Sequence, residues 1–517
     1  MSHRLKRISL GVGSSALAQA IAALQAFGLL PVFLHAWGPH TYGLWCSLTA
    51  LTSYLGLLDL GGQSYVGNRL AMHAAQANWA EFRRDLSEAL SLFLALGIGV
   101  SLVILLSLLL AIRVPLPILN RPLQVWEASV IGLQAPMYVL LTIPGGIYAT
   151  AYRAVGMFTR GAMIGNVFRL GGFAVSAGLL LLSATPPIYA LALCGVGAAL
   201  TGFIGWDIRR AIPQSRGIQL SLAAARKGCS RLGGGSWHFW TISVAQAINQ
   251  QGIVLIVAGA LTPEAVAIYT THRTLANISG FVGSLVQGPM LPEFSAFWAR
   301  NELEQLRRWA LSSIRFVIVA SGISALALWI AGPVVYPLWT GRHLSLQPVL
   351  LAVLVTQAIL SAGWTTSVWS LLAANRHRAV AAWSLANALV ALALAAILSR
   401  RMGLAGAALG SLVADIACGA FVFPLLLSRF LSLRVTQIYG EIGEALIALA
   451  PGAAMVLLVK IVFDGWWAIA VFVFLSAVLA HPTLHFALGK AGANNLIGDT
   501  TRNWMKKYSV PRIFRLR

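Results

Sequence analysis

Apolar segments long enough to cross a membrane follow one another along almost the whole chain. A bilayer core of about 30 Å needs roughly 20 apolar residues of α-helix, which satisfy their own backbone hydrogen bonds. The apolar runs are continuous rather than alternating, so they predict helices and not barrel strands. Only 10% of the 517 residues are charged and the mean hydropathy is +0.78, whereas soluble domains have about 25% charged residues. The sequence therefore predicts an all-α, polytopic membrane protein.

The positions of these runs predict about fourteen membrane spans, with bounds good to a few residues. We place the spans at 10–36, 42–68, 87–112, 125–150, 161–183, 187–206, 234–259, 264–291, 309–331, 346–374, 379–398, 404–427, 443–463 and 466–486.

The basic residues are concentrated in alternate loops. A formal charge of +22 would suit a nucleic-acid partner, but most Lys and Arg lie in loops on one predicted side of the membrane. The opposite loops contain only Arg113, Arg121, Arg342, Arg400 and Arg401. By the positive-inside rule, both termini are expected in the cytoplasm. The charge thus indicates topology and attraction to membrane lipids, with no nucleic-acid partner.

The chain lacks the motifs of several enzyme classes. No P-loop and no H-E-x-x-H zinc motif occurs, so neither ATP hydrolysis nor a metal centre is expected. Cys46, Cys194 and Cys418 fall inside spans, and Cys229 lies in a predicted cytoplasmic loop without paired spacing. The predicted outer loops are too short for a catalytic domain. We expect a transporter without cofactors and not an enzyme.

A weak internal repeat predicts the domain organisation. AQAI occurs at 18–21 and again at 245–248, and the same offset takes Tyr42 to Tyr269. An even number of spans separates the copies, so they point the same way, as in transporters made of two parallel halves. We predict two six-helix bundles around a central cavity, followed by two extra helices. The expected parts are 1–207 (first bundle), 208–233 (cytoplasmic linker), 234–428 (second bundle), 429–488 (extra helix pair) and 489–517 (basic cytoplasmic tail).

Polar residues at helical spacing follow the second and eighth spans. The stripe on the second span contains Thr49, Thr52, Gly56, Asp59 and Gln63. The stripe on the eighth contains Tyr269, Arg273, Asn277, Gly280, Ser284 and Gln287. Such a face either packs against another polar helix or borders a water-filled cavity, and matching stripes in both halves favour a cavity. Gln19 and Gln246 form a further matched pair of polar residues.

The first 70 residues resemble a known family. The tetrapeptide YGLW at 42–45, the Asp59-Leu60-Gly61 triplet and Arg69 resemble the opening of Wzx-type O-antigen flippases. This polysaccharide transporter family belongs to the multidrug/oligosaccharidyl-lipid/polysaccharide (MOP) exporter superfamily. The chain departs from many such flippases in having fourteen predicted spans rather than twelve. The extra pair resembles that of the lipid II flippase.

The resemblance implies a function and a location. It implies a flippase that moves undecaprenyl-pyrophosphate-linked oligosaccharide, an O-antigen or exopolysaccharide repeat unit, from the inner to the outer leaflet by alternating access. It implies the bacterial cytoplasmic (inner) membrane, and polysaccharide polymerase and chain-length proteins as partners. The alternatives are a cation-coupled multidrug antiporter of the same superfamily, or a polymerase or ligase of lipid-linked glycans.

Arginines inside the spans, or near their cytoplasmic mouth as Arg153 is, are the candidate pyrophosphate ligands. An uncompensated ion in hydrocarbon costs on the order of tens of kcal/mol, and the planar guanidinium binds two phosphate oxygens at once. We expect Arg273, Arg169 and Arg153 to bind substrate, together with the polar residues Asn277, Gln287 and Gln246. For Arg169 and Arg273 the alternative is snorkelling or an internal ion pair. Arg315, near a span end, is expected to snorkel.

Three charged residues are the candidates for gating or ion coupling. Asp59 lies near the predicted cytoplasmic mouth of the second span, before Gly61 and Gly62, and is either a latch or a helix cap. Asp415 lies in the middle of the twelfth span, as a partner for a cavity arginine or as a proton carrier. Arg69 follows the second span. A proton or sodium gradient is the expected energy source.

Overall fold

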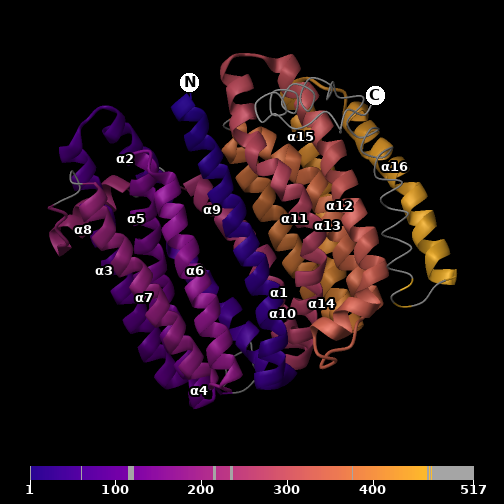
Figure 1. Ribbon diagram of the computed structural model, residues 1–517, viewed down its shortest axis with the longest axis horizontal. Helices are drawn as coiled ribbons and strands as arrows, with labels where there is room; N and C mark the ends of the chain where they lie inside the picture. Colours follow the sequence, from indigo (N-terminus) through magenta and orange to yellow (C-terminus); the bar gives the residue numbers. More distant parts are fainter. Residues whose placement is uncertain are drawn as a thin grey trace, which may run out of the picture. The chain divides into compact units, whose positions relative to one another are not determined.

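The structure is a computed structural model that describes residues 2–59, 61–114, 122–212, 217–232, 237–374, 376–462, 465 and 467, and every regular element within them is helical. The first helices are α1 (Ser2–Ser53), α2 (Gly62–Ala75), α3 (Trp79–Ala111), α4 (Val125–Pro136), α5 (Ile143–Ala154), α6 (Phe158–Leu181), α7 (Pro186–Ala211), α8 (Leu222–Leu232), α9 (Trp237–Ala247) and α10 (Ile253–Ala260). They are followed by α11 (Pro263–Ala299), α12 (Leu303–Trp339), α13 (Pro348–Ala373), α14 (His377–Ala414), α15 (Phe421–Leu431) and α16 (Val435–Val462). Figure 1 labels them along the chain.

The all-α polytopic fold is confirmed. Ten helical stretches of the described chain are long and apolar enough to cross a membrane. Each of the first thirteen predicted spans falls in a helical region, and the span predicted at 466–486 lies outside the described residues apart from residue 467. The chain is therefore a multi-pass membrane protein.

Two predicted pairs of neighbouring spans are separated by a glycine whose backbone is not helical. The first span and the start of the second lie in α1, on either side of Gly38, where the backbone is not helical (φ 70°). The spans predicted at 379–398 and 404–427 meet at Gly403 in α14, where φ is 59°. Only glycine adopts such φ values without steric cost, so each kink needs its glycine.

The second predicted span changes helix type before its end. After α1, residues Tyr54–Asp59 form a 3-10 segment (η1), and Gly61 has a left-handed backbone (φ 73°) before α2 begins. The glycine pair at 61 and 62 therefore breaks the helix, as the sequence indicates.

The described chain divides into two compact units. Unit 1 comprises Met1–Thr271, Pro337–Ser345 and Ser384–Gly410, and unit 2 comprises His272–Tyr336, Leu346–Trp383 and Ser411–Arg517.

The core of unit 1 is built mainly from α2, α3, α5 and α7. Fully buried side chains from these four helices pack together, including Leu70, Phe82, Ile147 and Ile208. A π-helical turn, Met137–Thr142 (η2), joins α4 to α5, whose second residue is Pro144. The α6 helix packs against α1 and α7. This arrangement puts α1, η2, α5, α6 and α7 around one hollow.

Unit 2 contains a separate core. Phe294 of α11, Ile314 of α12, Leu427 of α15 and Ile438 of α16 are among its fully buried members. The α15 helix follows a π-helical turn, Asp415–Ala420 (η5), which packs on α13.

Candidate functional site

A cavity in unit 1 brings together two of the predicted arginines. Arg153 of α5 and Arg169 of α6 line a hollow of about 640 Å³, together with Gln19 of α1. Its remaining walls come from α1, η2, α5, α6 and α7. This volume lies in the range of small-ligand sites.

Small residues at helical spacing make room for the cavity. Gly161 and Gly165 precede Arg169 at intervals of four along α6, so all three share one face of that helix. Gly145 and Ala149 precede Arg153 in the same way along α5. A side chain added at Gly165 would meet open space. Each arginine therefore follows a row of small residues along one wall.

The two arginines have uncompensated charge. Within the described parts of the chain, neither Arg153 nor Arg169 lies within ion-pair distance of a carboxylate, and both side chains are exposed. No acidic residue is among the described residues that line the cavity. The Gln19 side-chain oxygen is buried without a hydrogen-bond partner in the described structure. The cavity thus offers two cations, and the Gln19 side chain forms part of its wall.

Arg169 lies deep in its helix and Arg153 lies at a helix end. Eleven residues separate Phe158, where α6 begins, from Arg169, which is about 17 Å at the helical rise. Half of a bilayer core is about 15 Å. Arg153 is the penultimate residue of α5. The two positive charges therefore lie at the edge and near the middle of the span.

Arg160 has a structural role beside the cavity. Its guanidinium donates two hydrogen bonds to Asp207 of α7, at 2.9 and 2.6 Å, and the Tyr152 hydroxyl donates to the same carboxylate at 2.6 Å. This buried carboxylate ties α5, α6 and α7 together. Arg160 is therefore neutralised where Arg153 and Arg169 are not.

The other predicted substrate ligands lie outside this cavity. Gln246 is exposed on α9. In unit 2, Arg273 is half-buried and Asn277 is exposed one turn later on α11, and Gln287 falls among residues whose side chains are not described. Next to Arg273, the buried His272 ring accepts a hydrogen bond from the backbone N–H of Gln347 at 2.9 Å. It also contacts the Tyr336 hydroxyl at 3.1 Å. His272 is thus a satisfied neighbour.

The polar stripe of the second span is partly packed. Thr52 is buried, and its hydroxyl donates to Gln134 of α4 at 2.7 Å, while Thr49 accepts from the same amide at 3.3 Å. The expectation that Thr52 borders a cavity is wrong: a glutamine on the neighbouring helix satisfies it. Asp59 accepts a hydrogen bond from the Gln63 backbone N–H across the break at Gly61, at 3.1 Å. By this contact Asp59 caps the start of α2. Its role as a latch stays a prediction.

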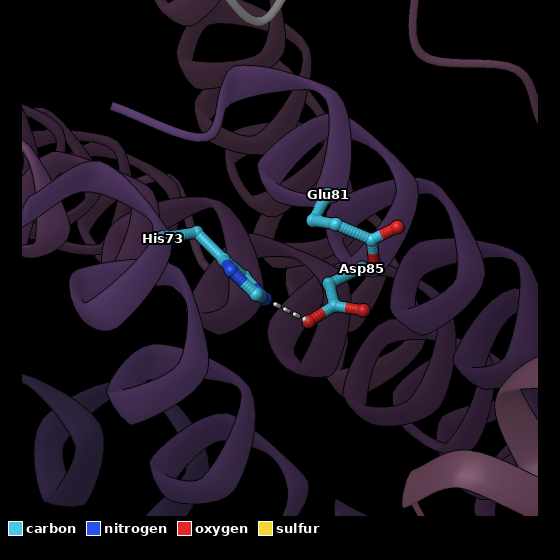
Figure 2. A group of neighbouring side chains, drawn as sticks. All are labelled: His73, Glu81 and Asp85. Atoms are coloured by element: carbon cyan, nitrogen blue, oxygen red, sulfur yellow. Dashed lines mark hydrogen bonds and ion pairs between the residues drawn. The ribbon is translucent and has the colours of Figure 1, made fainter. Parts of the chain in front are cut away.

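Arg69 of α2 belongs to an ion-pair cluster at the start of α3. Its guanidinium donates twice to the buried Asp85, at 2.7 and 3.1 Å, and these bonds raise the pKa of Arg69 above its ordinary value. Arg231 of α8 pairs with Glu81 and Glu88 at 3.3 Å each. Figure 2 shows the His73 ring and Asp85 carboxylate facing each other, with Glu81 one turn away on α3.

This cluster has the composition of an ion-pair network. Ligand atoms of His73, Glu81 and Asp85 lie within 4.8 Å of one another, which is close enough for a shared metal ion. The two carboxylates already accept hydrogen bonds from Arg69 and Arg231. The cluster therefore fastens α2, α3 and α8 together, and Arg69 keeps its charge there.

Asp415 is buried in unit 2 at the start of the π-helical turn η5. Its carboxylate accepts hydrogen bonds from the Gln357 amide and the Ser361 hydroxyl of α13, each at 3.0 Å. Single π-helical turns inside α-helices are frequent at functional sites. Its part in ion coupling stays a prediction.

Sequence reasoning found both cavity arginines but missed the glycine row that makes the cavity. The signal was present, because Gly161, Gly165 and Arg169 recur at intervals of four. Gln19 was noticed only as one of a matched pair.

Comparison with known proteins identifies the fold. No family model and no curated protein sequence matches this chain. Among solved structures, the lipid II flippase MurJ in its inward closed conformation superposes with a TM-score of 0.64 at 11% identity, over 94% of this chain and 99% of that one. An inward-facing multidrug resistance MATE transporter superposes with a TM-score of 0.58 at 14% identity, over 82% of this chain and 97% of the other. At these identities the likeness shows the fold alone. The chain has the membrane-transporter fold that the MurJ flippase and the MATE transporter of the MOP superfamily share.

Proposed function

We propose that this protein is a flippase that moves undecaprenyl-pyrophosphate-linked oligosaccharide across the cytoplasmic membrane by alternating access. The observation that carries this proposal is the pair of uncompensated arginines, Arg153 and Arg169, in one cavity whose described lining contains no acidic residue. An anion that must pass through hydrocarbon needs such cations along its path.

The chemistry of the cavity suits a pyrophosphate headgroup. Each guanidinium presents a planar fork that binds two phosphate oxygens, so either arginine can hold a phosphate of the headgroup. Arg153, at the end of α5, is positioned to meet the headgroup first, and Arg169 about half a bilayer deeper receives it.

The structural neighbours support transport of a lipid-linked substrate. The lipid II flippase matches over almost the full length of both chains. We extend its type of activity, the flipping of a lipid-linked molecule, to this chain because the cavity carries the complementary charge. The proposal that the oligosaccharide is an O-antigen or exopolysaccharide unit rests on the resemblance of residues 42–69 to Wzx-type flippases.

A multidrug antiporter is the second candidate, because a MATE transporter has the same fold. Cationic drugs need a site with carboxylates, and the cavity in unit 1 offers arginines instead. The buried Asp415 is the residue in unit 2 that would serve such a role, and under either function it is our candidate for coupling to a proton or sodium gradient.

The test measures the leaflet in which the lipid-linked oligosaccharide accumulates. Cells that lack the protein are fed a click-tagged sugar, and the tagged lipid is quantified in intact and in permeabilised cells with an impermeant reagent. We expect the tagged lipid to accumulate in the inner leaflet without the protein, and to return to the outer leaflet when the wild-type protein is restored. Uptake of a fluorescent cationic drug is measured in the same cells.

Two outcomes contradict the proposal. If the tagged lipid reaches the outer leaflet normally in cells that lack the protein, this chain is not the flippase. If the same cells instead accumulate the cationic drug, the antiporter is the better description.

A further inference from the structure

An apolar groove runs between α3 and α8 in unit 1, away from the arginine cavity. It has a volume of about 520 Å³. Its lining residues are Leu92, Ala95, Leu96, Gly99, Val100, Val103, Ala225, Arg226 and Cys229. Arg226 is the one charged side chain among these described residues.

The helix that forms the outer wall is held firmly against α3. Arg231 of α8 pairs with Glu81 and Glu88, and the Ser221 amide donates to the Ser91 hydroxyl at 3.2 Å. A Cβ atom added at Gly228 would lie 2.8 Å from the Glu88 carbonyl oxygen, so the two helices touch there through their backbones. The groove is therefore a fixed feature of unit 1.

The hollow itself arises because small residues face it. Ala95 and Gly99 on α3 line the groove, and a Cβ atom added at Gly99 would have no atom within 4 Å. Gly99 is exposed, as are Leu96 and Val103 beside it. The groove is thus open along its side and apolar along its length.

The length and level of the groove match one lipid leaflet. Leu92 and Val103 are eleven residues apart, about 17 Å at the helical rise, and half of a bilayer core is about 15 Å. The ion-paired Asp85 and Glu88 lie within two turns before Leu92 on α3. These charges mark the level of the water interface, so the groove starts at that interface and ends near the bilayer centre.

Arg226 provides a cation at the interfacial end. Its side chain is exposed, and in the part of the chain that the structure describes no carboxylate pairs with it. Arg231, one turn further on α8, is fully engaged by acidic residues. The neighbouring Lys227 is also exposed. Arg226 is therefore an available cation at the end of an acyl-sized groove, and Lys227 follows it in sequence.

We propose that this groove is a binding site for an anionic glycerophospholipid, with one acyl chain along α3 and the headgroup phosphate on Arg226. A headgroup with net negative charge is favoured because each basic residue near a membrane surface contributes about 1 kcal/mol toward anionic lipids. A zwitterionic headgroup carries its own ammonium and gains less. The site is independent of the proposed function.

The test is photo-crosslinking of lipid to the purified full-length protein. The protein is reconstituted into phosphatidylcholine vesicles that contain a minor fraction of photoreactive phosphatidylglycerol, or photoreactive phosphatidylcholine in a parallel sample. Crosslinked peptides are mapped by mass spectrometry. We expect phosphatidylglycerol to label the segments 92–103 and 222–232 about fivefold more than phosphatidylcholine does, the equivalent of ~1 kcal/mol.

Two variants and two matched controls separate the headgroup from the groove. Arg226→Gln should remove the preference for phosphatidylglycerol, and Gly99→Leu should lower labelling by both lipids because it fills the groove. Arg113→Gln removes an exposed arginine at the opposite end of α3, and Gly171→Leu adds the same side chain at an exposed, open position on α6. Both controls should label as the wild type does.

Three results would overturn the site. Equal labelling by the two lipids indicates ordinary boundary lipid, and a preference that survives Arg226→Gln contradicts the headgroup assignment. Labelling unchanged in Gly99→Leu shows that the chain does not occupy the groove. Thermal melting of each variant in detergent verifies folding, and none of these readouts depends on transport.

Discussion

At the scale of single residues, Arg169 is the one on which the proposed function most depends. Its guanidinium lies about 17 Å along α6 and lines the cavity without an acidic partner among the described residues. A charge at that depth is costly and is therefore expected to have a function. Its exposed position in the cavity removes the internal ion pair as the simplest explanation.

We expect Arg169→Gln to reduce the rate at which tagged lipid appears in the outer leaflet about ten- to a hundredfold. A hydrogen bond to a charged group contributes about 1.5–3 kcal/mol, and glutamine offers neither the charge nor the fork. Arg169→Lys should retain part of the rate because the charge remains. Arg210→Gln, at an exposed cation on α7 that contacts the Trp206 ring, is the control. Normal export by Arg169→Gln at wild-type abundance would exclude Arg169 as a phosphate ligand.

Arg315 shows that the type of a residue and its position in a span do not determine its partners. The prediction that it snorkels to the interface is wrong. The side chain is buried on α12, and its guanidinium pairs with Glu441 and, at 3.3 Å, with Glu444 of α16. The partners lie about 126 positions later in the chain, so no local pattern could reveal them.

The buried pair predicts a large effect on stability. Arg315→Ala leaves two carboxylates without their cation, and breaking a buried ion pair from one side costs about 3–5 kcal/mol. We expect a clear fall in the melting temperature of the protein in detergent. Arg308→Ala is the matched control on the same helix, because Arg308 is exposed and its acidic partner among the described residues is the exposed Glu304. A melting temperature equal to that of the control would show that the pair does not hold α16 to α12.

At the scale of elements, α6 combines a wall of small residues with a cation. Gly161, Gly165 and Arg169 share one face, so the helix both opens the cavity and charges it. The volume of the cavity can therefore be changed by mutation while the charge of Arg169 is kept.

We expect Gly165→Leu to lower export at least tenfold while the protein still folds. A side chain at Gly165 enters open space in the cavity, so it displaces substrate without a clash. Gly171→Leu is the control, since Gly171 lies on the same helix with equally open surroundings but does not line the cavity. The measurement is the outer-leaflet lipid assay together with a detergent melting curve. Equal export by both variants would mean that substrate does not pass through this cavity.

Elements were more predictable from sequence than the contacts between them. Apolar runs revealed thirteen of the predicted spans as helical regions, because lipid permits only a helix there. The breaks predicted between spans at 37–41 and at 399–403 are confirmed by the non-helical backbone of Gly38 and Gly403, but an apolar run shows its own length and not the geometry of the turn. Thr52 finds Gln134 on α4, 82 positions away, and that pairing depends on packing that no spacing rule encodes.

The site was predicted in the same uneven way. Arg169 was a candidate because charged residues are rare in spans, and Arg153 because it lies near the predicted cytoplasmic mouth of the same span; the structure brings both into one cavity. Arg69, which follows the second span, was a candidate for gating, yet Asp85 on α3 pairs with it. Whether a cation has an acidic partner is decided by the neighbouring helix.

At the scale of the whole molecule, the distribution of charge predicts orientation. The exposed Cys229 lies on α8 beside Arg226 and Lys227, in the stretch with the greatest excess of basic residues between spans. Arg113 is exposed at the opposite end of α3, in a predicted outer loop. These two positions therefore report the two sides of the membrane.

We expect single cysteines at these positions to differ in access from outside the cell. In a variant that retains Cys229 as its single cysteine, an impermeant maleimide should react only after permeabilisation, because basic loops remain in the cytoplasm. In a cysteine-free background, Arg113→Cys should react in intact cells. The opposite pattern would invert the orientation, place the Arg153 end of the cavity outside, and reverse the direction of transport proposed from it.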